Sequence, residues 1–280
     1  MDADAASPIV ADLHAHTTVS DGTLTLAEVP DAAREANVEW VALTDHDRIH
    51  PEIDAPVIER DGIRIVRGIE LRVDAGFERV DLLGYGVEHT DALDAEIERL
   101  QTDRQQRGAR ILELVEAELG VDLDVEPRPG LGRPHIARAI AASSAPYDYE
   151  GAFDELIGND GPCFVAREVT PVERGVELLE EACAVVGLAH PFRYDDPDAA
   201  LELAGELDAV ERWYPYGGGV EADPERVDLI AAEADLLRTG GTDAHERTLG
   251  VAGLTREAFA PVRERLPEPV PAEPPSDEQG

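Results

Sequence analysis

Residues 9–23 read IVADLHAHTTVSDGT, a short apolar run that passes into two histidines and then into a polar turn. The apolar, β-branched start predicts a buried strand over Ile9 to Leu13. Side chains two positions apart point to the same face of a strand, so His14 and His16 are expected to aim at one point. Two imidazoles placed in this way form a good clamp for a divalent metal ion, although a chance surface pair would have the same pattern.

Outward from this stretch, apolar runs of similar length alternate with helical patterns. The predicted strands are Ile9 to Leu13, Trp40 to Thr44, Ile63 to Ile69, Val80 to Tyr85, Val185 to Ala189, Ala209 to Tyr214 and Leu236 to Thr239. Strands that alternate with helices predict an α/β fold. We expect a distorted, seven-stranded (β/α) barrel that resembles a TIM barrel and carries a helical insertion.

The alternation breaks between residues 89 and 165, where a long amphipathic stretch from Asp91 to Leu119 is followed by shorter helical segments. We interpret this region as a helical insertion within one catalytic domain of residues 8–265. Residues 266–280 are rich in Pro and Glu and have few apolar side chains to bury, which predicts a disordered acidic tail.

The composition is strongly acidic: 24 basic residues against 61 acidic ones give a formal charge of −37, and every basic side chain is arginine. Such a surface repels long duplex nucleic acid and anionic membranes, so an anionic substrate needs a local source of positive charge. Acidic residues without lysine are typical of proteins from salt-accumulating archaea, and we expect a halophilic host. The absence of lysine excludes P-loop and Schiff-base chemistry.

Other features of the sequence narrow the class of protein. No apolar run approaches the roughly 20 residues of a membrane span, and the N-terminus lacks the pattern of a signal peptide, which predicts a cytoplasmic protein. Cys163 and Cys183 do not form a C-x-x-C pair, so neither a disulfide framework nor a thiolate zinc site is indicated. No partner protein is indicated either.

Residues of metal-ligand type recur where the predicted strands end. They are Asp21 in the turn after the first strand, Asp45 and His46 after the second, Glu70 after the third, His190 after the fifth, and Asp243 and His245 after the seventh. Each alone has an ordinary explanation, as a helix cap, a core histidine or a surface acid. Their repetition at one end of a barrel favours a metal-dependent active site.

Five motifs in this order resemble the PHP (polymerase and histidinol phosphatase) superfamily over residues 11–250. They are DLHAHTTVSDGT (12–23), ALTDHD (42–47), GIE (68–70), LAHP (188–191) and GTDAH (241–245). Within the insertion, GRPHIARAI (132–140) and AFDELIGNDGPCFV (152–165) resemble the branch of trinuclear phosphoesterases. Members of that branch act on nucleotide phosphates or as 5′–3′ exonucleases on short nucleic acids.

The resemblance implies two or three bound divalent ions. One ion would be held by His14, His16, Glu70 and Asp243, a second by Glu70 and His190, and a third by Asp21, His46 and His245. At the position of a family histidine on the fourth strand this chain has Asp81. An aspartate there would favour manganese, iron or magnesium over zinc, or would leave that ion weakly bound or absent. Asp45 and Glu211 are expected to support the ligands.

The mechanism that the resemblance implies needs no protein nucleophile. Adjacent ions would lower the pKa of a bridging water, hold it in line with phosphorus and neutralise the phosphoryl oxygens. Arg133 and His135 match the family's R-P-H motif and are expected to bind phosphate, Arg133 through two hydrogen bonds. Arg104 and Arg107 are further candidates, with ordinary solvated charges as the alternative.

The sequence therefore predicts a metal-dependent hydrolase of nucleotide phosphates or short single-stranded oligonucleotides. A second hypothesis is a phosphatase of histidinol phosphate or another small molecule. A third, from another class, is a metal-binding regulatory module with weakened catalysis, which only Asp81 favours.

Overall fold

The computed structural model of the chain describes residues 7–126 and 131–272. The residues divide into two compact units. One unit contains the chain up to Leu93 and from Thr170 onward, and the other contains Asp94–Val169. None of the helices within these described ranges combines the length and the apolarity that a bilayer crossing requires.

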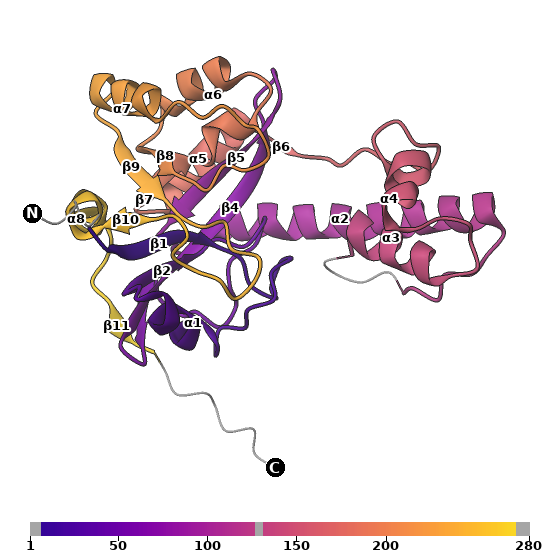
Figure 1. Ribbon diagram of the computed structural model, residues 1–280, viewed down its shortest axis with the longest axis horizontal. Coiled ribbons are helices and arrows are strands. Elements are labelled where there is room, and N and C mark those ends of the chain that lie inside the picture. The colour runs from indigo at the N-terminus through magenta and orange to yellow at the C-terminus, as the bar shows by residue number, and fades with distance from the viewer. Residues whose placement is uncertain (1–6, 127–130, 273–280) are drawn as a thin grey trace, which may run out of the picture. The chain divides into compact units, whose positions relative to one another are not determined.

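The first unit is built on a mixed sheet with a main path in the order β10-β1-β2-β4-β5-β7-β8-β9 (Figure 1). The strands of this path are β1 (Ile9–Ala15), β2 (Trp40–Leu43), β4 (Ile63–Asp74), β5 (Arg79–Tyr85), β7 (Val185–Leu188), β8 (Ala209–Trp213), β9 (Leu237–Gly240) and β10 (Leu254–Thr255). All seven predicted strands are thus present, and β10 adds an eighth.

The sheet closes almost into a barrel. β1, β2 and β4 are parallel, as are β7, β8 and β9. Beyond β9, Ala244 bridges to Ala15 at the end of β1, where the N–H of His16 donates to the carbonyl of Ala244 at 2.8 Å. The predicted α/β barrel is therefore confirmed as a mixed α/β fold with a nearly closed, barrel-shaped sheet.

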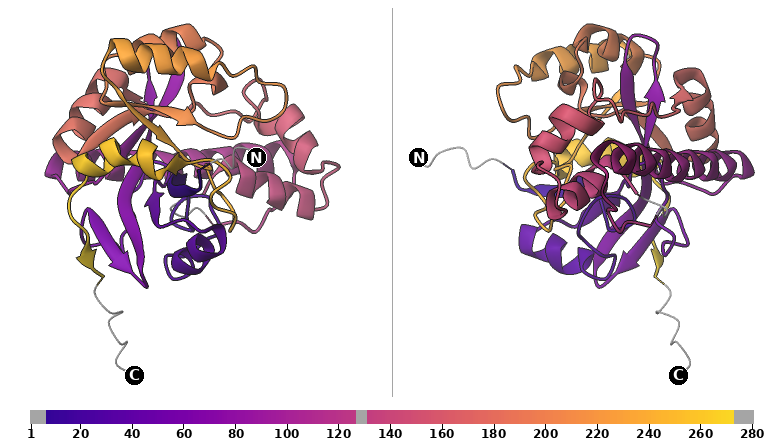
Figure 2. Two further views of the ribbon diagram at one scale, coloured as in Figure 1. Left: turned by 60° about the vertical axis from the view of Figure 1, so that its left-hand side comes forward. Right: turned by 90° about the vertical axis from the view of Figure 1, so that its right-hand side faces the viewer.

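Helices cover the outside of this sheet (Figures 1 and 2). α1 packs on β4, α5 on β4, β5 and β7, α6 on β7, α7 on β8 and β9, and α8 on β1, β9 and β10. Their bounds are α1 (Val29–Ala36), α5 (Val172–Ala182), α6 (Pro197–Ala204), α7 (Pro224–Glu233) and α8 (Arg256–Arg265), with the short 3-10 helix η2 (Pro191–Arg193). Because the strands are covered on both faces, β1, β2 and β7 are buried along nearly their whole length.

The hydrophobic core stabilises this arrangement from both faces of the sheet. Leu13, Leu83 and Val185 belong to one buried cluster, and Leu43 and Ile65 belong to another. Burial of such a side chain contributes about 1.5–3 kcal/mol to folding. Asp12 and His14 alternate with Leu13 and Ala15 along β1 and are buried polar residues.

Two strands differ from the prediction in a way that matters for the site. β4 continues to Asp74, so Glu70 lies inside the strand and not at its end. β5 returns antiparallel to β4 and is also antiparallel to β7. Asp81 therefore lies near the start of its strand, yet the hairpin brings it to the same end of the barrel as Glu70.

Three short strands lie beside the main path. They are β3 (Val57–Arg60), β6 (Thr170–Pro171) and β11 (Val270–Pro271). β11 pairs with β3, and Leu266 is buried in the core. Part of the segment that we predicted to be disordered, residues 266–272, is thus structured; its remainder, 273–280, lies outside the described residues.

The second unit is helical. It contains most of the long helix α2 (Asp91–Leu119), then α3 (Arg133–Ala142), α4 (Tyr149–Ala152) and the π-helix η1 (Phe153–Ile157). Ile111 and Val115, one turn apart on α2, are buried with Ile136, Ile140 and Ile157 in a core of its own. This unit contains all four residues for which we predicted phosphate binding.

Candidate metal centre

The nine residues expected to bind metal lie together at one end of the barrel, where β1, β2, β7 and β9 end. Among the described residues, eight of the nine form three groups of converging ligand atoms, and Asp243 lies beside these groups. The groups are His16, Asp21, His46 and His245; His14, His16 and Glu70; and Glu70, Asp81 and His190. Five of the chain's eight histidines are used in them.

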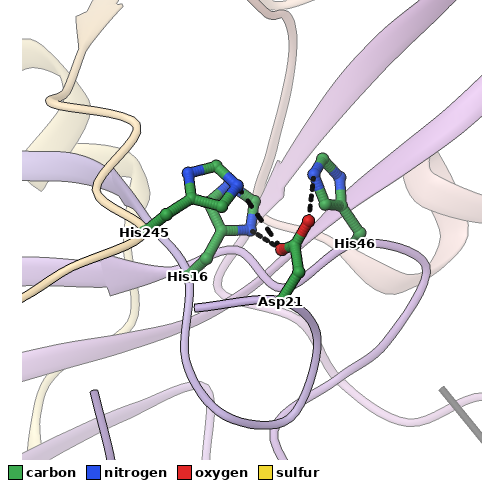
Figure 3. A group of neighbouring side chains, drawn as sticks. All are labelled: His16, Asp21, His46 and His245. Atoms are coloured by element: carbon green, nitrogen blue, oxygen red, sulfur yellow. Dashed lines mark ion pairs between the residues drawn. The ribbon is translucent and has the colours of Figure 1, made fainter. Parts of the chain in front are cut away.

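Figure 3 shows the first group, in which three imidazoles surround the carboxylate of Asp21. Its oxygens lie 3.4 Å from His245 Nε2, 3.7 Å from His46 Nε2 and 4.0 Å from His16 Nδ1. The rings of His16 and His245 stack with their centroids 4.3 Å apart. Possible metal ligands that follow β1, β2 and β9 thus meet at one point with Asp21, from the turn after β1.

Glu70 connects the groups because each of its oxygens faces a different pair of histidines. Oε1 lies 3.1 Å from His190 Nε2 and 3.5 Å from His14 Nε2. Oε2 lies 2.7 Å from His46 Nδ1 and 3.4 Å from His16 Nε2. A buried carboxylate in this position has the arrangement of a bridging ligand.

Asp243 turns its two oxygens in opposite directions. Oδ1 lies 3.0 Å from His16 Nε2 and 3.5 Å from His14 Nε2. Oδ2 accepts hydrogen bonds from the Tyr214 hydroxyl at 2.8 Å and from Arg193 Nη1 at 3.1 Å. The backbone of Asp243 has a φ of 53°, in the left-handed region, which aspartate adopts more readily than most residues other than glycine.

Glu211 and Asp45, the two predicted supporting residues, form hydrogen bonds next to the candidate ligands. Glu211 Oε1 lies 3.1 Å from His14 Nδ1, and Oε2 accepts from the backbone N–H of His190 at 2.7 Å. Asp45 accepts from the N–H of Thr17 at 2.8 Å and from the Ser20 hydroxyl at 2.6 Å. Asp45 therefore fixes the turn that carries Asp21.

Asp12 is a supporting residue that the sequence reasoning missed. Its buried carboxylate accepts from the N–H of Thr242 at 2.9 Å, from the Thr242 hydroxyl at 2.6 Å and from the N–H of Gly250 at 2.8 Å. It ties β1 to the loop that carries Asp243. The signal was available, because Asp12 alternates with His14 and His16 on the same face of β1.

Charges at the centre hold the carboxylates in their ionised form. Burial would raise the pKa of Glu70, but the charges of His46 and His14 hold it well below its ordinary value. Burial likewise opposes ionisation of Asp243, whose pKa is lowered by His16 and His14. In return, and against the effect of burial, Glu70 and Asp21 raise the pKa of His46 to about 9.

The candidate ligand atoms are better placed to coordinate metal ions than to form hydrogen bonds with one another. Within the described part of the chain, buried atoms without a hydrogen-bond partner include His14 Nε2, both ring nitrogens of His16, Glu70 Oε2 and Asp243 Oδ1. His16 Nε2 and Asp243 Oδ1, for example, lie 3.0 Å apart and yet do not form a hydrogen bond with each other. Buried polar atoms without partners are costly, and a divalent ion with nitrogen and oxygen ligands would satisfy them.

The four predicted phosphate-binding residues lie in the helical unit. Arg133 Nη1 donates to Asn159 Oδ1 at 3.0 Å, and Arg107 Nε donates to the carbonyl of Val165 at 2.7 Å. Burial, together with the charges of Arg133, Arg167 and Arg104, lowers the pKa of Arg107 to about 10. Arg167 was not predicted.

His135 has a structural role in this unit. Its Nδ1 accepts from the N–H of Gly132 at 3.3 Å and so caps the start of α3. The three predicted arginines Arg104, Arg107 and Arg133 thus gather into one positively charged cluster, whereas His135 supports the helix that carries Arg133.

Beside the metal centre, the first unit has a cavity of about 600 Å³ with an aromatic wall of Phe192, Tyr214 and Tyr216. The rings of Tyr214 and Tyr216 lie with centroids 4.7 Å apart. Tyr214 also reaches Asp243 through its hydroxyl, so this wall adjoins the ligand cluster.

Comparison with known proteins agrees with this geometry. The model of a family described as the PHP domain matches residues 12–160. The chain is 32% identical over 254 residues to phosphoribosyl 1,2-cyclic phosphate 1,2-diphosphodiesterase of Eggerthella lenta, covering 85% of this chain and 94% of that one. It is 30% identical over 259 residues to 3′,5′-nucleoside bisphosphate phosphatase of Chromobacterium violaceum, covering 84% and 86%.

The fold is also similar to a solved structure from Bifidobacterium adolescentis, with a TM-score of 0.72 and 22% identity. The match covers 94% of this chain and 99% of that one. At this identity the likeness concerns the fold alone, and it includes the nearly closed barrel described above.

Proposed function

This chain belongs to the PHP domain family of phosphoesterases, and from that premise we propose that it hydrolyses phosphate esters of nucleotides or other ribose phosphates with the help of bound divalent ions. The observation that carries the proposal is the convergence on common points of histidine nitrogens and carboxylate oxygens, several of which have no hydrogen-bond partner among the residues that the structure describes.

Two groups are proposed to hold ions. Asp21, His46 and His245 would hold one, and His14, His16, Glu70 and Asp243 would hold the other. Mixed nitrogen and oxygen ligands suit manganese, iron or zinc, with magnesium as a further candidate. When bound, such ions supply a water of lowered pKa and positive charge for the phosphoryl oxygens.

The chain's own residues prepare the histidines for this task. A carboxylate only accepts hydrogen bonds, so once an ion is bound Glu211 would keep the remaining proton of His14 on Nδ1 and leave Nε2, on the side of Glu70, as the ligand atom. The carbonyl of Asp243 does the same for His245, whose Nδ1 lies 3.0 Å from it while Nε2 faces Asp21. Both imidazoles are therefore oriented as neutral ligands.

Two positive regions, one in each unit, are each proposed to bind an anionic group. Arg193, beside Asp243, has a side chain that is 51% exposed and can meet an incoming anion. In the helical unit, Arg104 and Arg133 lie close enough to Arg107 to repel its charge, and an anion there would offset this repulsion. Both regions supply local positive charge on a chain with a net charge of −37.

The relatives suggest what the ester is attached to. The names of the two relatives above specify a phosphoribosyl cyclic phosphate and a nucleoside bisphosphate, which share a phosphorylated ribose. The aromatic wall of Phe192, Tyr214 and Tyr216 offers a stacking surface for a base next to the metal centre. We therefore place a nucleoside phosphate ahead of a small-molecule phosphate such as histidinol phosphate, and we propose short single strands as the only nucleic acids that it accepts.

The test is phosphate release in high salt with manganese, because a chain of this charge is proposed to need screening. The panel contains a nucleoside 3′,5′-bisphosphate, a 5′-phosphorylated oligoribonucleotide and histidinol phosphate. We expect turnover of the bisphosphate or of the oligonucleotide, lost in Asp243→Ala. Turnover of histidinol phosphate alone would favour the small-molecule phosphatase, and no turnover despite bound metal would favour a regulatory module.

A further inference from the structure

The three ligand groups are not equivalent. In the two groups that contain His16, several buried ligand atoms lack a hydrogen-bond partner among the described residues. In the third group, Glu70 Oε1 and His190 Nε2 are hydrogen-bonded to each other at 3.1 Å, and both oxygens of Asp81 are occupied. Within the described part of the chain, the atoms of this group without a hydrogen-bond partner are His190 Nδ1 and Glu70 Oε2. Neither lies between Asp81 and His190, because Asp81 faces His190 Nε2 and Glu70 Oε2 faces His46 and His16.

Both carboxylate oxygens of Asp81 accept hydrogen bonds from an arginine. Arg72 Nε donates to Asp81 Oδ1 at 2.7 Å, and Arg72 Nη2 donates to Oδ2. The two residues lie opposite each other in the hairpin of β4 and β5, so the backbone register fixes the pair. The N–H of Arg72 also donates to Asp47 Oδ1 at 3.1 Å, and the N–H of Asp81 donates to the Tyr194 hydroxyl at 2.9 Å.

The contrast with Asp243 shows what this pairing does. Asp243 also meets an arginine, but Arg193 and Tyr214 both bind Oδ2, and Oδ1 is left toward two histidines. Arg72 takes one lone pair from each oxygen of Asp81 in a two-pronged contact, which is among the strongest ion pairs that proteins form. Asp243 therefore keeps one oxygen that accepts no hydrogen bond within the described part of the chain, whereas each oxygen of Asp81 already accepts one from a charged guanidinium.

We propose that the Arg72–Asp81 ion pair replaces a metal ion at the His190 side of the centre, so that the protein binds two divalent ions and not three. This inference rests on the proposed function, because it concerns the ions of the same site. An ion placed beside Asp81 would have to displace or lie against a guanidinium that carries a full positive charge.

Arg72 also supplies the charge that the missing ion would have brought. Its side chain is 42% exposed although Asp81 is buried. Nε and Nη2 hold Asp81, while Nη1 makes no hydrogen bond within the described part of the chain. Arg72 can thus donate through Nη1 to an oxygen of the substrate phosphate while Asp81 holds the guanidinium in place.

The experiment is a count of manganese ions per chain after metal removal, equilibration with manganese and gel filtration, measured by elemental analysis. The wild-type chain is expected to retain two ions. Arg72→Gln, which keeps the size and polarity of the side chain but removes its charge, frees Asp81 and is expected to retain three. Arg64→Gln removes an arginine that pairs with Glu59 at 3.2 Å at the β3–β4 hairpin, and is expected to retain two.

A wild-type count other than two overturns the proposal, and this measurement needs no variant. A count of two in both the wild type and a folded Arg72→Gln would overturn the role of the arginine. The result is separate from the proposed function, because the ions are counted without turnover. Two ions without phosphatase activity would contradict the proposed function and leave this inference standing. Phosphatase activity with three ions would support the proposed function and overturn this inference.

Discussion

Glu211 Oε1 lies 3.1 Å from Nδ1 of His14, while the other ring nitrogen, Nε2, points toward Glu70 and Asp243. Neither side chain is exposed to solvent. Because a carboxylate only accepts hydrogen bonds, Nδ1 is the donor nitrogen in this pair, and Nε2 is the nitrogen that would be available to an ion.

Replacing Glu211 by alanine is expected to weaken manganese binding about 10- to 100-fold, the usual cost of losing a residue that orients a metal-binding histidine. Isothermal titration of the metal-free protein with manganese measures this. Glu233→Ala, an exposed acid at the end of α7, is the matched control and should bind as the wild type does. Equal affinities for the two variants would contradict the role of Glu211.

Gly241 packs against the backbone of β1, and this closeness predicts a stability defect. A Cβ at this position would lie 2.3 Å from the backbone nitrogen of His14. Gly241→Ala is therefore expected to lower the free energy of unfolding by about 1–3 kcal/mol, as overpacking typically does. Gly217→Ala, where an added Cβ meets no atom within 4 Å, serves as the control in the same denaturant titration. A Gly241 variant as stable as this control would show that β1 and the loop after β9 are less tightly packed.

Metal binding is expected to depend on pH. The pKa of His46 in the metal-free protein is raised to about 9, since Glu70 and Asp21 outweigh the effect of burial. His46 is therefore protonated at pH 7 and must lose its proton to become a ligand, so manganese affinity should rise from pH 7 toward pH 9. Titrations at pH 7 in buffers of different ionisation enthalpy should report proton release. Proton uptake, or an affinity that falls over this range, would argue against His46 as a ligand.

The aromatic wall predicts a variant that discriminates between substrates. Tyr216→Ala removes a ring that adjoins Tyr214, and loss of one stacking contact is worth about 1–3 kcal/mol. The KM for a nucleoside bisphosphate should therefore rise about tenfold or more, with little change for ribose 5-phosphate, which has no base. A parallel rise for both substrates would mean that the cavity does not hold the base.

Much of the fold was predictable from residue patterns. Apolar runs predicted all seven main strands, because strands covered on both faces read as continuous hydrophobic segments. The β3–β4 hairpin was missed although its signal is present: Asp61 and Gly62 form a two-residue connection, with φ values of 51° and 81° that favour these residue types. β10 and β11 have two residues each, which is too short for a periodic pattern.

The site was predictable where ligand types recur at strand ends, and it was less so where partners come from elsewhere. The sequence of β5 does not show whether the strand runs parallel or antiparallel to β4. The closeness of Asp81 to Glu70 results from the antiparallel hairpin and was not predictable from the strand itself. The pairing of Arg72 with Asp81 was missed for the same reason, because it follows from the register of two strands. Asp12 was also missed, although it lies two residues before His14 and was therefore expected on the same face of the strand.

The central claim is that this centre hydrolyses phosphate esters only with its ions bound. The most direct measurement is phosphate release from a nucleoside 3′,5′-bisphosphate by protein that has been stripped of metal with a chelator and then supplied with manganese. The stripped protein should be inactive, and manganese should restore activity to the wild type but not to Asp243→Ala. Undiminished release by the stripped protein, or equal restoration in the Asp243 variant, would contradict the claim.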